Sequence, residues 1–569
     1  IRTAYSASEP PAGARLILAG PSVFAVRARA DIEGDAWRLS LVATSLVLLL
    51  LAWVYRSAPL VIAGALPVVT GVAVGVAAVA LGFGAVHGIT LGFGATLIGE
   101  AVDYSTYLFL HQRRDEAMAA ALARIWPTLR LAVLTTVFSG FTMLASSFQG
   151  LAQLGVLLVV GILVAGLVTR WVLPALDEMG LERFTRSKLE ALPAVLDPRR
   201  LQSLPRMSTA FAIGLTLVAA AYLVQQGEAL WDDDLESLSP ISAEQKNLDG
   251  ALRTELGAPD VRYLIAVTAR AQEAALQASE ALQAPLSKLV EAGAIAGFDM
   301  AALFLPSDSR QTTRRAALPT PERLGAALDA ALDGLPFKPE VFKPFLAAVE
   351  ATRGGLALTR ADLDRTSIGL RVRSLLTEHD GEWTALVPLA SVADARALRT
   401  GLAPYLGEAT MLLDLKAESN AMVASYRGES LRLTGLGLLA IVGVLVWGLR
   451  GIRPVARILA PVVAAVVLDV AALTLLGVRL SLFHLVALLL VVGVGLNYAL
   501  FFGRPEPNPR EQARTTLSLV VCALTTLAAF GALATSAMPV LRAIGLTVSL
   551  GIVLSFALAA LFAPRSRIA

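Results

Sequence analysis

Apolar stretches of about 20 residues recur along the chain, separated by shorter polar segments. A helix needs about 20 consecutive apolar residues to cross the hydrocarbon core of a bilayer. Eleven stretches meet this requirement, and we predict that each forms a membrane-spanning helix. The predicted spans are residues 37–55, 59–81, 89–110, 130–148, 151–173, 206–224, 430–449, 455–477, 482–502, 515–535 and 540–562. The pattern therefore predicts an α-helical membrane protein.

Arginine and lysine gather at every second span end. The clusters lie at Arg56 and at residues 111–114, 183–200, 450–457, 504–514 and 565–567. Positively charged loops are retained on the cytoplasmic side, and the opposite loops here are very short and carry little charge. This bias predicts a bacterial inner-membrane protein with residues 1–36 and about 225–429 outside the cytoplasm.

The long segment between the apolar runs has a different composition. It combines turn clusters, a strand-like run at 261–267 and an alanine-rich amphipathic stretch at 270–292, which predicts a folded α+β domain. Arg15–Leu18 resembles a strand that leads into a helix, so residues 1–36 are interpreted as the tail of a second periplasmic domain. The predicted divisions are residues 1–36, the first transmembrane half with the first span of the second half at 37–224, the periplasmic domain at 225–429, and the rest of the second half at 430–569.

The two sets of spans are duplicates. Residues 53–69 align with residues 447–463 without a gap, and the same register pairs Asp103-Tyr104 with Asn497-Tyr498. The remaining matches are Arg38 with Arg432, Gly99 with Gly493, residues 134–136 with 524–526, and Gly155 with Gly545. Matched elements run in the same direction, so we expect a parallel repeat with a functional site between the halves. Because eleven is odd, we expect a twelfth span and most of a first periplasmic domain before residue 1.

Two acids in the third predicted span are the strongest candidates for chemistry. An ionisable group in the hydrocarbon region costs roughly 2.5 to 3.5 kcal/mol on insertion scales, so it needs a partner or a function. Glu100 and Asp103 are three residues apart and share one helix face. Repulsion and desolvation favour proton binding by at least one of them near neutral pH. A proton-relay role is favoured for Asp103, the alternative being a structural hydrogen bond to Tyr498 or Tyr104, and the two roles are evenly balanced for Glu100.

Other polar residues in the spans give weaker signals. Asn497 matches Asp103 in the repeat but cannot titrate, so any relay is asymmetric. Asp469 is a lone acid that either titrates or pairs with a backbone group or an arginine. The threonines, which can bond across the halves or to their own helix backbone, are Thr135, Thr136, Thr525 and Thr526.

Composition excludes several classes of protein. The chain is 56% hydrophobic and 16% charged, which is too apolar for an ordinary soluble domain. Its net charge of +3 is spread beside apolar runs rather than in one basic stripe, so no nucleic-acid partner is expected. Cys522 is alone and reads as a packed core residue, and no histidine has metal-ligand spacing to a second ligand. No metal, cofactor or catalytic residue is predicted, and an enzyme is disfavoured.

The six-span repeat, the large domain after the first span of a half, and the run Gly99-Glu100-Ala101-Val102-Asp103-Tyr104 together resemble the resistance-nodulation-division (RND) superfamily, specifically its MMPL-type predicted exporters. The resemblance covers essentially the whole chain. It implies a relay at the centre of the membrane domain, here Asp103 and Tyr104 with Tyr498 opposite. Lipid exporters of the family often carry an Asp-Tyr pair in both halves, and Asn497 departs from that pattern. This departure makes Glu100 a more interesting candidate for the relay.

This resemblance implies a proton-motive-force-driven secondary transporter that exports a lipidic or acyl-type molecule from the inner membrane toward the periplasm. Its partners are then membrane lipids, the hydrophobic cargo and protons, and the resemblance also allows for a homo-oligomer or a periplasmic carrier protein. The alternative is an accessory membrane protein of the same fold that acts on a protein or a sterol-like partner and exports no cargo.

Overall fold

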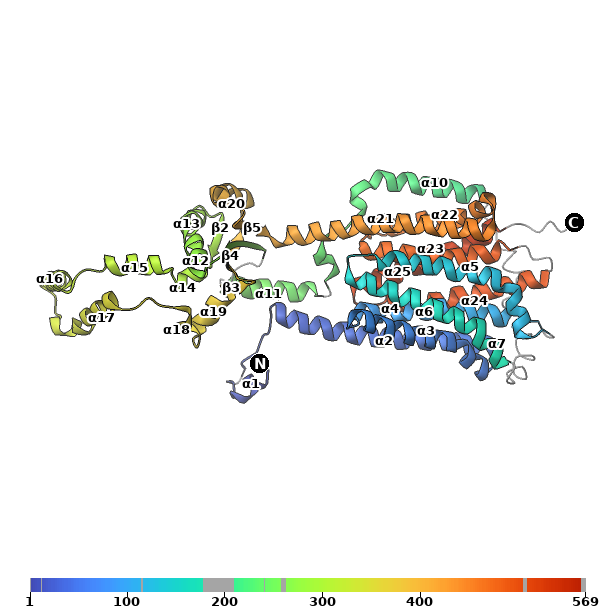
Figure 1. The fold of residues 1–569 in the computed structure, drawn as a ribbon, viewed down its shortest axis with the longest axis horizontal. Helices are drawn as coiled ribbons and strands as arrows, with labels where there is room; N and C mark the ends of the chain where they lie inside the picture. Colours follow the sequence, from blue (N-terminus) through green and yellow to red (C-terminus); the bar gives the residue numbers. More distant parts are fainter. Residues whose placement is uncertain are drawn as a thin grey trace. The chain divides into compact units, whose positions relative to one another are not determined.

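The computed structural model describes residues 2–11, 13–113, 116–177, 209–239, 241–256, 262–504 and 509–563. The predicted cytoplasmic segment at 183–200 and the arginines at 565 and 567 lie outside the described residues. Two compact units make up the chain: a helical bundle formed by residues 1–242 and 420–569, and a smaller unit formed by residues 243–419 (Figure 1).

Ten helices in the described parts of the chain are long and apolar enough to cross a membrane. They are α2 (Pro21–Tyr55), α3 (Ala58–Phe83), α5 (Met118–Leu144), α6 with its continuations η1 and α7 (Gln149–Leu176), α10 with η5 (Thr209–Leu230), α21 (Leu415–Leu449), α22 (Ile452–Leu475), α23 (Leu482–Phe502), α24 (Pro509–Ala534) and α25 (Pro539–Phe562). The remaining predicted span, 89–110, forms α4 (Gly88–His111), a helix of matching length that is not among the ten. The α-helical membrane architecture is confirmed.

One local prediction near the start of the chain is wrong. Residues 14–19 form no strand, because a strand needs a hydrogen-bonded partner and the described residues offer none there. A short helix, α1 (Arg2–Ala7), precedes this segment, and α2 begins at Pro21. The apolar pattern predicted the spanning part of α2 correctly, but it does not indicate whether a segment has a partner strand.

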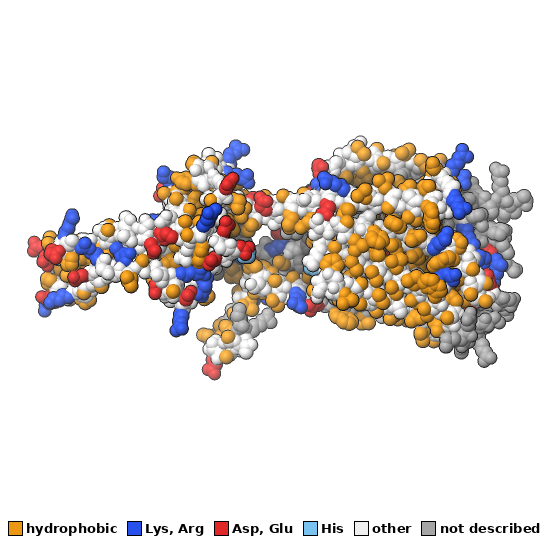
Figure 2. Space-filling model, in the orientation of Figure 1, with side chains coloured by type: hydrophobic (Ala, Val, Ile, Leu, Met, Phe, Trp, Pro, Cys, Tyr) orange, Lys and Arg blue, Asp and Glu red, His pale blue; other side chains and the backbone are white. Residues whose placement is uncertain are grey.

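The flank of the helical bundle is covered by apolar side chains, whereas both signs of charge are scattered over the smaller unit (Figure 2). Large side chains that stay exposed on the bundle include Leu41, Leu49, Ile62, Leu81 and Trp171. A bilayer offers no hydrogen bonds to the backbone, so a spanning segment must satisfy its own peptide groups as a helix. Exposed apolar side chains on such helices are solvated by lipid.

Helix packing repeats between the halves. In the first half α3, α4 and α5 each pack against α6, and in the second half α22, α23 and α24 each pack against α25. Both α3 and α22 contain an internal proline, Pro67 and Pro461. The helices before them, α2 and α21, are followed by arginines in the left-handed region, with φ of 49° at Arg56 and 53° at Arg450. The halves meet where α4 packs on α24 and α5 packs on α23.

Equivalent glycines allow the closest helix approach in each half. A Cβ atom on Gly155 of α6 would lie 2.6 Å from the backbone nitrogen of Leu144 on α5. A Cβ atom on Gly545 of α25 would overlap the backbone of Ala534 on α24. Side chains are therefore excluded at both positions, which explains why the repeat keeps glycine there.

The smaller unit is built on a five-stranded antiparallel sheet with strand order β2-β4-β1-β5, and β3 pairs with β4. Its strands are β1 (Tyr263–Ala269), β2 (Ile295–Phe298), β3 (Leu376–His379), β4 (Glu382–Val392) and β5 (Thr410–Asp414). Its α-helices are α11 (Ala243–Leu256), α12 (Gln272–Ala281), α13 (Gln283–Glu291), α14 (Ala301–Phe304), α15 (Asp308–Ala317), α16 (Pro321–Leu332), α17 (Lys343–Gly354), α18 (Arg360–Leu363), α19 (Ser367–Leu375) and α20 (Ala395–Leu402). The predicted α+β composition is confirmed.

Register places alternate side chains of the central strands in the core of this unit. β1 pairs with β4 through Ile265 opposite Val387, and both side chains are fully buried. The amphipathic stretch predicted at 270–292 forms α12 and α13, which bury Leu276 and Leu286 in the same core. This core is separate from that of the helical bundle.

Candidate functional site

Glu100 lies in the middle of α4 at the junction of the halves. Its side chain is buried, and its Oε1 atom accepts a hydrogen bond of 2.8 Å from Thr136 Oγ1 on α5. A Cβ atom on Gly493 of α23 would lie 3.9 Å from this Oε1, so the backbone of the second half passes beside the carboxyl group. Glu100 is thus held by its own half and faces the other.

Asp103 lies one turn further along α4 and is fully buried against the second half. Its Oδ1 atom is 3.5 Å from Thr525 Oγ1 on α24. The same hydroxyl is 2.8 Å from the carbonyl oxygen of Cys522, a much shorter contact. A single hydroxyl proton favours the closer acceptor. Within the described residues the Asp103 Oδ2 atom has no hydrogen-bond partner. The carboxyl group is therefore held only loosely.

Three other predicted site residues lie in the interior of the same helical bundle. Tyr104, Asn497 and Tyr498 are all fully buried in the bundle. Neither tyrosine hydroxyl, nor either polar atom of the Asn497 side chain, has a hydrogen-bond partner in the described part of the chain. The structural alternative for Asp103, a hydrogen bond to Tyr104 or Tyr498, is therefore absent from this arrangement.

The four candidate threonines divide into two groups. Thr135 bonds to the carbonyl of Ala132, and Thr526 bonds to the carbonyl of Cys522, each at 2.8 Å within its own helix. Thr136 bonds to Glu100 inside the first half. Of the four, Thr525 is the one whose hydroxyl approaches an acid of the opposite half. Self-bonding is the common behaviour of threonine in a membrane helix.

Two residues that the sequence analysis did not single out adjoin Asp103. The thiol of Cys522 lies beside the Asp103 carboxyl group and the Tyr107 hydroxyl. The Tyr107 ring stacks on Phe501 of α23 with 4.0 Å between ring centroids. Tyr107 is four residues after Asp103, and Cys522 is three before Thr525, so helical spacing from the predicted residues could have identified both.

Further polar contacts continue toward the end of α4. The His111 Nδ1 atom donates to the carbonyl of Tyr107 at 2.9 Å, and its Nε2 atom is 3.0 Å from Thr515 Oγ1 on α24. Beyond it, Arg124 forms ion pairs with Glu116 at 2.9 Å and with Glu511 at 3.1 Å. A row of polar groups therefore runs along the α4–α24 junction from Asp103 to a charged network.

Asp469 lies apart from this row, on α22. It is fully buried, and neither carboxyl oxygen has a hydrogen-bond partner among the described residues. Neither of the predicted pairings, with a backbone group or with an arginine, is present among the described residues. A Cβ atom on Gly551 of α25 would lie 2.9 Å from Asp469 Oδ2, so glycine makes room for the acid. In the repeat, Asp469 occupies the position of Gly75.

This arrangement is suited to moving protons rather than to bond-making chemistry. Carboxyl groups inside a membrane bundle can bind and release protons, and they are placed at pathways when they persist there. In the described ranges, no group of three or more histidine, cysteine, aspartate or glutamate side chains could hold a metal ion. Two repeated halves of membrane-spanning helices with acids at their junction define a multi-pass transporter-type membrane protein.

Comparison with known proteins makes the assignment specific. Residues 1–191 match the model of the MMPL family, the family that the sequence resembles. A curated relative, the hopanoid transporter HpnN of Rhodopseudomonas palustris (strain TIE-1), is 24% identical over 618 residues that cover 97% of this chain and 70% of that protein. With ten helices in its described parts that are long and apolar enough to cross a membrane, the chain is a multi-pass membrane protein that is similar to transporters.

Solved structures share the fold. SecDF of Thermus thermophilus, a translocon-associated membrane protein, matches with a TM-score of 0.50 at 16% identity, over 93% of this chain and 62% of that one. A heavy metal efflux pump matches with a TM-score of 0.53 at 14% identity, over 94% of this chain and 67% of that one. The chain therefore spans less than two thirds of the length of SecDF. At these identities the likeness establishes the fold alone.

Proposed function

We propose that this chain is the membrane-embedded part of a proton-driven exporter of lipidic molecules. In this proposal Asp103 carries the proton, and Glu100, Tyr104, Asn497 and Tyr498 assist it. The observation that carries the proposal is the place of Asp103: fully buried, between helices of opposite halves, with Oδ2 free of hydrogen bonds among the described residues. Loss or gain of a proton there changes the charge between α4 and α24, and so biases how the halves pack.

The proposed direction of coupling follows from the predicted topology. Protons enter from the periplasmic side, neutralise Asp103, and leave along Tyr107 and His111 toward the charged network at Arg124 and Glu511. The neutral acid favours close packing of α4 on α24, and the ionised acid favours separation because its burial is costly. The predicted periplasmic domain at 225–429 accepts the cargo as the halves move.

The cargo class is proposed from the family and from one relative. The curated relative HpnN is described as a hopanoid transporter, so a hopanoid is the first molecule to test. Buried acids and a lipid-facing bundle would serve an accessory motor acting on a partner protein equally well, and the SecDF likeness is to a translocon-associated protein. A cargo assay separates these two functions.

The test uses the full-length protein in proteoliposomes with an imposed pH gradient and a labelled hopanoid in the donor leaflet. Transfer should occur with the gradient, stop when a protonophore collapses it, and stop in Asp103→Asn at unchanged expression and melting temperature. Asn497→Gln is the matched control, because it changes the equivalent position without altering charge. Full transfer by Asp103→Asn would overturn the proton-carrier assignment, and gradient-driven proton flux without lipid transfer would favour the accessory motor.

A further inference from the structure

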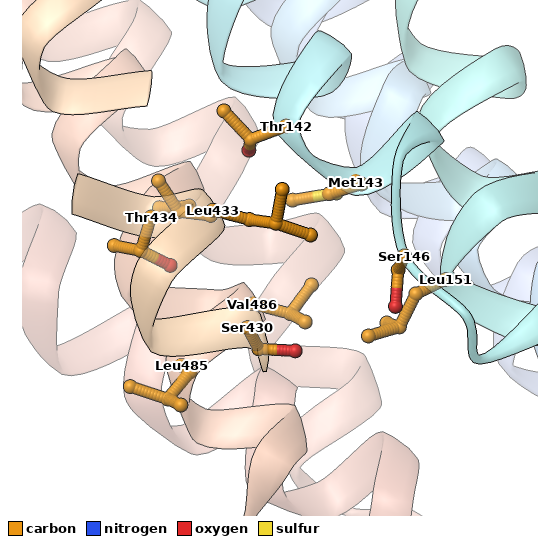
Figure 3. A pocket seen from close by; sticks show the side chains of 10 residues that line it. Thr142, Met143, Ser146, Leu151, Ser430, Leu433, Thr434, Leu485 and Val486 are labelled. Carbon is orange, nitrogen blue, oxygen red and sulfur yellow. The ribbon is translucent and has the colours of Figure 1, made fainter. Parts of the chain in front are cut away.

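A second feature of the bundle lies between the two halves, where α5 connects to α6. A cavity of about 20 Å³, part of it open to the surroundings, is bordered by α5, the start of α6, α21 and α23 (Figure 3). It is lined by Thr142, Met143, Ser146, Leu151, Ser430, Leu433, Thr434, Leu485, Val486 and Leu489. The first four belong to the first half and the others to the second, so the cavity shares its walls between both.

The lining has two kinds of side chain and no third. Six lining residues are apolar, and the other four carry hydroxyl groups. The Ser430 hydroxyl points into the space between α21 and the α5–α6 hairpin (Figure 3). Ser430 is 7% exposed, and its Oγ atom has no hydrogen-bond partner in the described ranges. A buried hydroxyl without a partner costs about 1–3 kcal/mol, so this group favours a ligand that supplies one.

The neighbouring hydroxyls can complete such a contact. Thr142 Oγ1 donates to the carbonyl of Ser139 at 2.7 Å, which leaves its oxygen free to accept. Ser146 Oγ accepts from the backbone nitrogen of Phe148 at 3.2 Å, which leaves its hydroxyl proton free to donate. The cavity therefore offers both donors and acceptors above an apolar floor.

Charge at the cavity selects against anionic ligands. None of the ten lining residues is basic. Glu429, next to Ser430, accepts hydrogen bonds from the backbone nitrogen and the hydroxyl of Ser147 at 2.9 Å and 3.0 Å, and so places a carboxylate beside the mouth. A phosphate or carboxylate head group would be desolvated there with no cation among the lining residues to compensate it.

Leu39 of α2 matches Leu433 of α21 in the repeat, yet Leu39 is only 3% exposed while Leu433 is partly exposed and lines the cavity. The anchoring contact beside the cavity is duplicated: Asp35 accepts from Ser536 Oγ and from the backbone nitrogen of Ala537, as Glu429 does from Ser147. The two halves therefore share this carboxylate contact but differ in how deeply the matched leucines are buried.

We propose that this cavity binds the hydroxyl-bearing end of a neutral membrane lipid, whose apolar body remains in the surrounding bilayer. A cavity of about 20 Å³ has room for roughly one water-sized group, so the hydroxyl end of a lipid is the fitting occupant and a whole ligand is too large. Ser430 is the recognising group, and Leu433 and Leu485 contact the first carbons. This inference rests on the proposed lipid-transport function and names where the lipid first meets the protein.

The experiment uses the full chain in nanodiscs with two photoreactive probes of equal chain length, a diazirine fatty alcohol and the corresponding fatty acid. Crosslinked peptides are mapped by mass spectrometry without a pH gradient. The alcohol should label peptides containing residues 142–151 and 430–434, and the acid should label them at least five-fold less. Ser430→Ala should reduce alcohol labelling about five-fold, and Leu433→Trp, which fills the cavity, should abolish it.

Leu439→Trp is the matched control, because Leu439 lies on the same helix and is 69% exposed. Its labelling should equal that of the unmodified protein. Equal labelling by both probes, or unchanged labelling in Leu433→Trp, would overturn the proposal. Because binding is measured without a gradient, Asp103→Asn should leave labelling intact. The lipid-binding proposal can therefore be disproved while the proton-coupling proposal is supported, and the opposite outcome is equally distinguishable.

Discussion

Asp103 and Asn497 occupy equivalent positions on α4 and α23, but only the first can carry a proton. The reverse holds on the preceding helices, where Gly75 of α3 matches Asp469 of α22. Each half thus contains a buried acid at a position where its twin is neutral. The helix packing is duplicated, with α3 on α6 and α22 on α25, so the chemical difference lies in the side chains and not in the frame.

This difference shows how two halves with duplicated helix packing can respond unequally to protonation. Two identical halves would respond identically to protonation, and their effects on the shared junction would cancel. Unequal acids give unequal responses, and under the proposed function a proton therefore biases one half relative to the other. The matched leucines differ as well, since Leu433 lines a cavity and Leu39 is buried.

The strongest test of the difference between the halves is to exchange Asp103 and Asn497. In the double variant Asp103→Asn with Asn497→Asp, we expect gradient-driven transport to remain at background. The approach of Thr525 to Asp103 has no counterpart at residue 497, because neither polar atom of the Asn497 side chain has a hydrogen-bond partner among the described residues. Transport in proteoliposomes is the measurement. Recovery to half or more of the normal rate would show that either half can host the carrier.

A second change tests the helix pair that carries Asp469. Gly75→Asp should prevent stable folding, because a Cβ atom there would lie 2.9 Å from Leu157 Cδ1 and the acid would add an unpaired buried group. Overpacking costs about 1–3 kcal/mol, and the desolvated acid adds to that cost. Thermal unfolding followed by size-exclusion chromatography measures the loss. Asp469→Gly is the control and should fold, and equal stability of the two variants would contradict this account.

The duplicated anchors allow a quantitative comparison of the halves. Glu429→Gln and Asp35→Asn should each lower the free energy of unfolding by about 1 kcal/mol, because each weakens two hydrogen bonds to a carboxylate. The anchors lie on different hairpins, so their effects should add in the double variant. Thermal melts of all three variants provide the measurement. Strong non-additivity would indicate that the two halves are coupled through these contacts.

The smallest predicted effect concerns Asp414, which directly precedes α21. Burial acts to raise the pKa of Asp414, but hydrogen bonds from the Arg262 guanidinium and the Ala417 backbone nitrogen outweigh it and hold that pKa below its ordinary value. The lowered pKa means that Asp414 stabilises the α+β unit above about pH 4 and loses this contribution as the pH falls further.

Asp414→Asn should therefore reduce protease resistance of residues 243–419 at pH 6, and the difference from the unmodified chain should narrow toward pH 3. A change of about 1 kcal/mol or less is expected, since the pair is partly exposed to solvent. The start of α2 has no side-chain cap at Gly20 and provides the contrast, so Gly20→Ala should alter no pH dependence. A pH-independent effect of Asp414→Asn would contradict the assigned ionisation.

Much of the fold could be predicted from the sequence because lipid imposes a simple rule. Apolar length marks a spanning helix, and matched glycines and prolines, such as Gly155 with Gly545, mark the duplication. The strand predicted at Arg15–Leu18 failed because pairing depends on a partner that local sequence does not specify. In the site, Glu100 and Asp103 could be identified from the sequence, and helical spacing could have added Tyr107 and Cys522, but that Cys522 lies beside Asp103 depends on how α4 and α24 pack together. The relay role stays a prediction.

The sequence by itself determined the membrane class, the repeat and the unequal acids, because each is a property of residues along one chain and their solvation. Tertiary structure alone decided that Asp103 faces Thr525 of the opposite half, that Asp469 lies against Gly551 without a partner in the described residues, and that Leu433 of α21 lines a cavity. These facts depend on contacts between helices hundreds of residues apart. Differences of a few ångströms in such packing are set by the shapes of all the neighbours together.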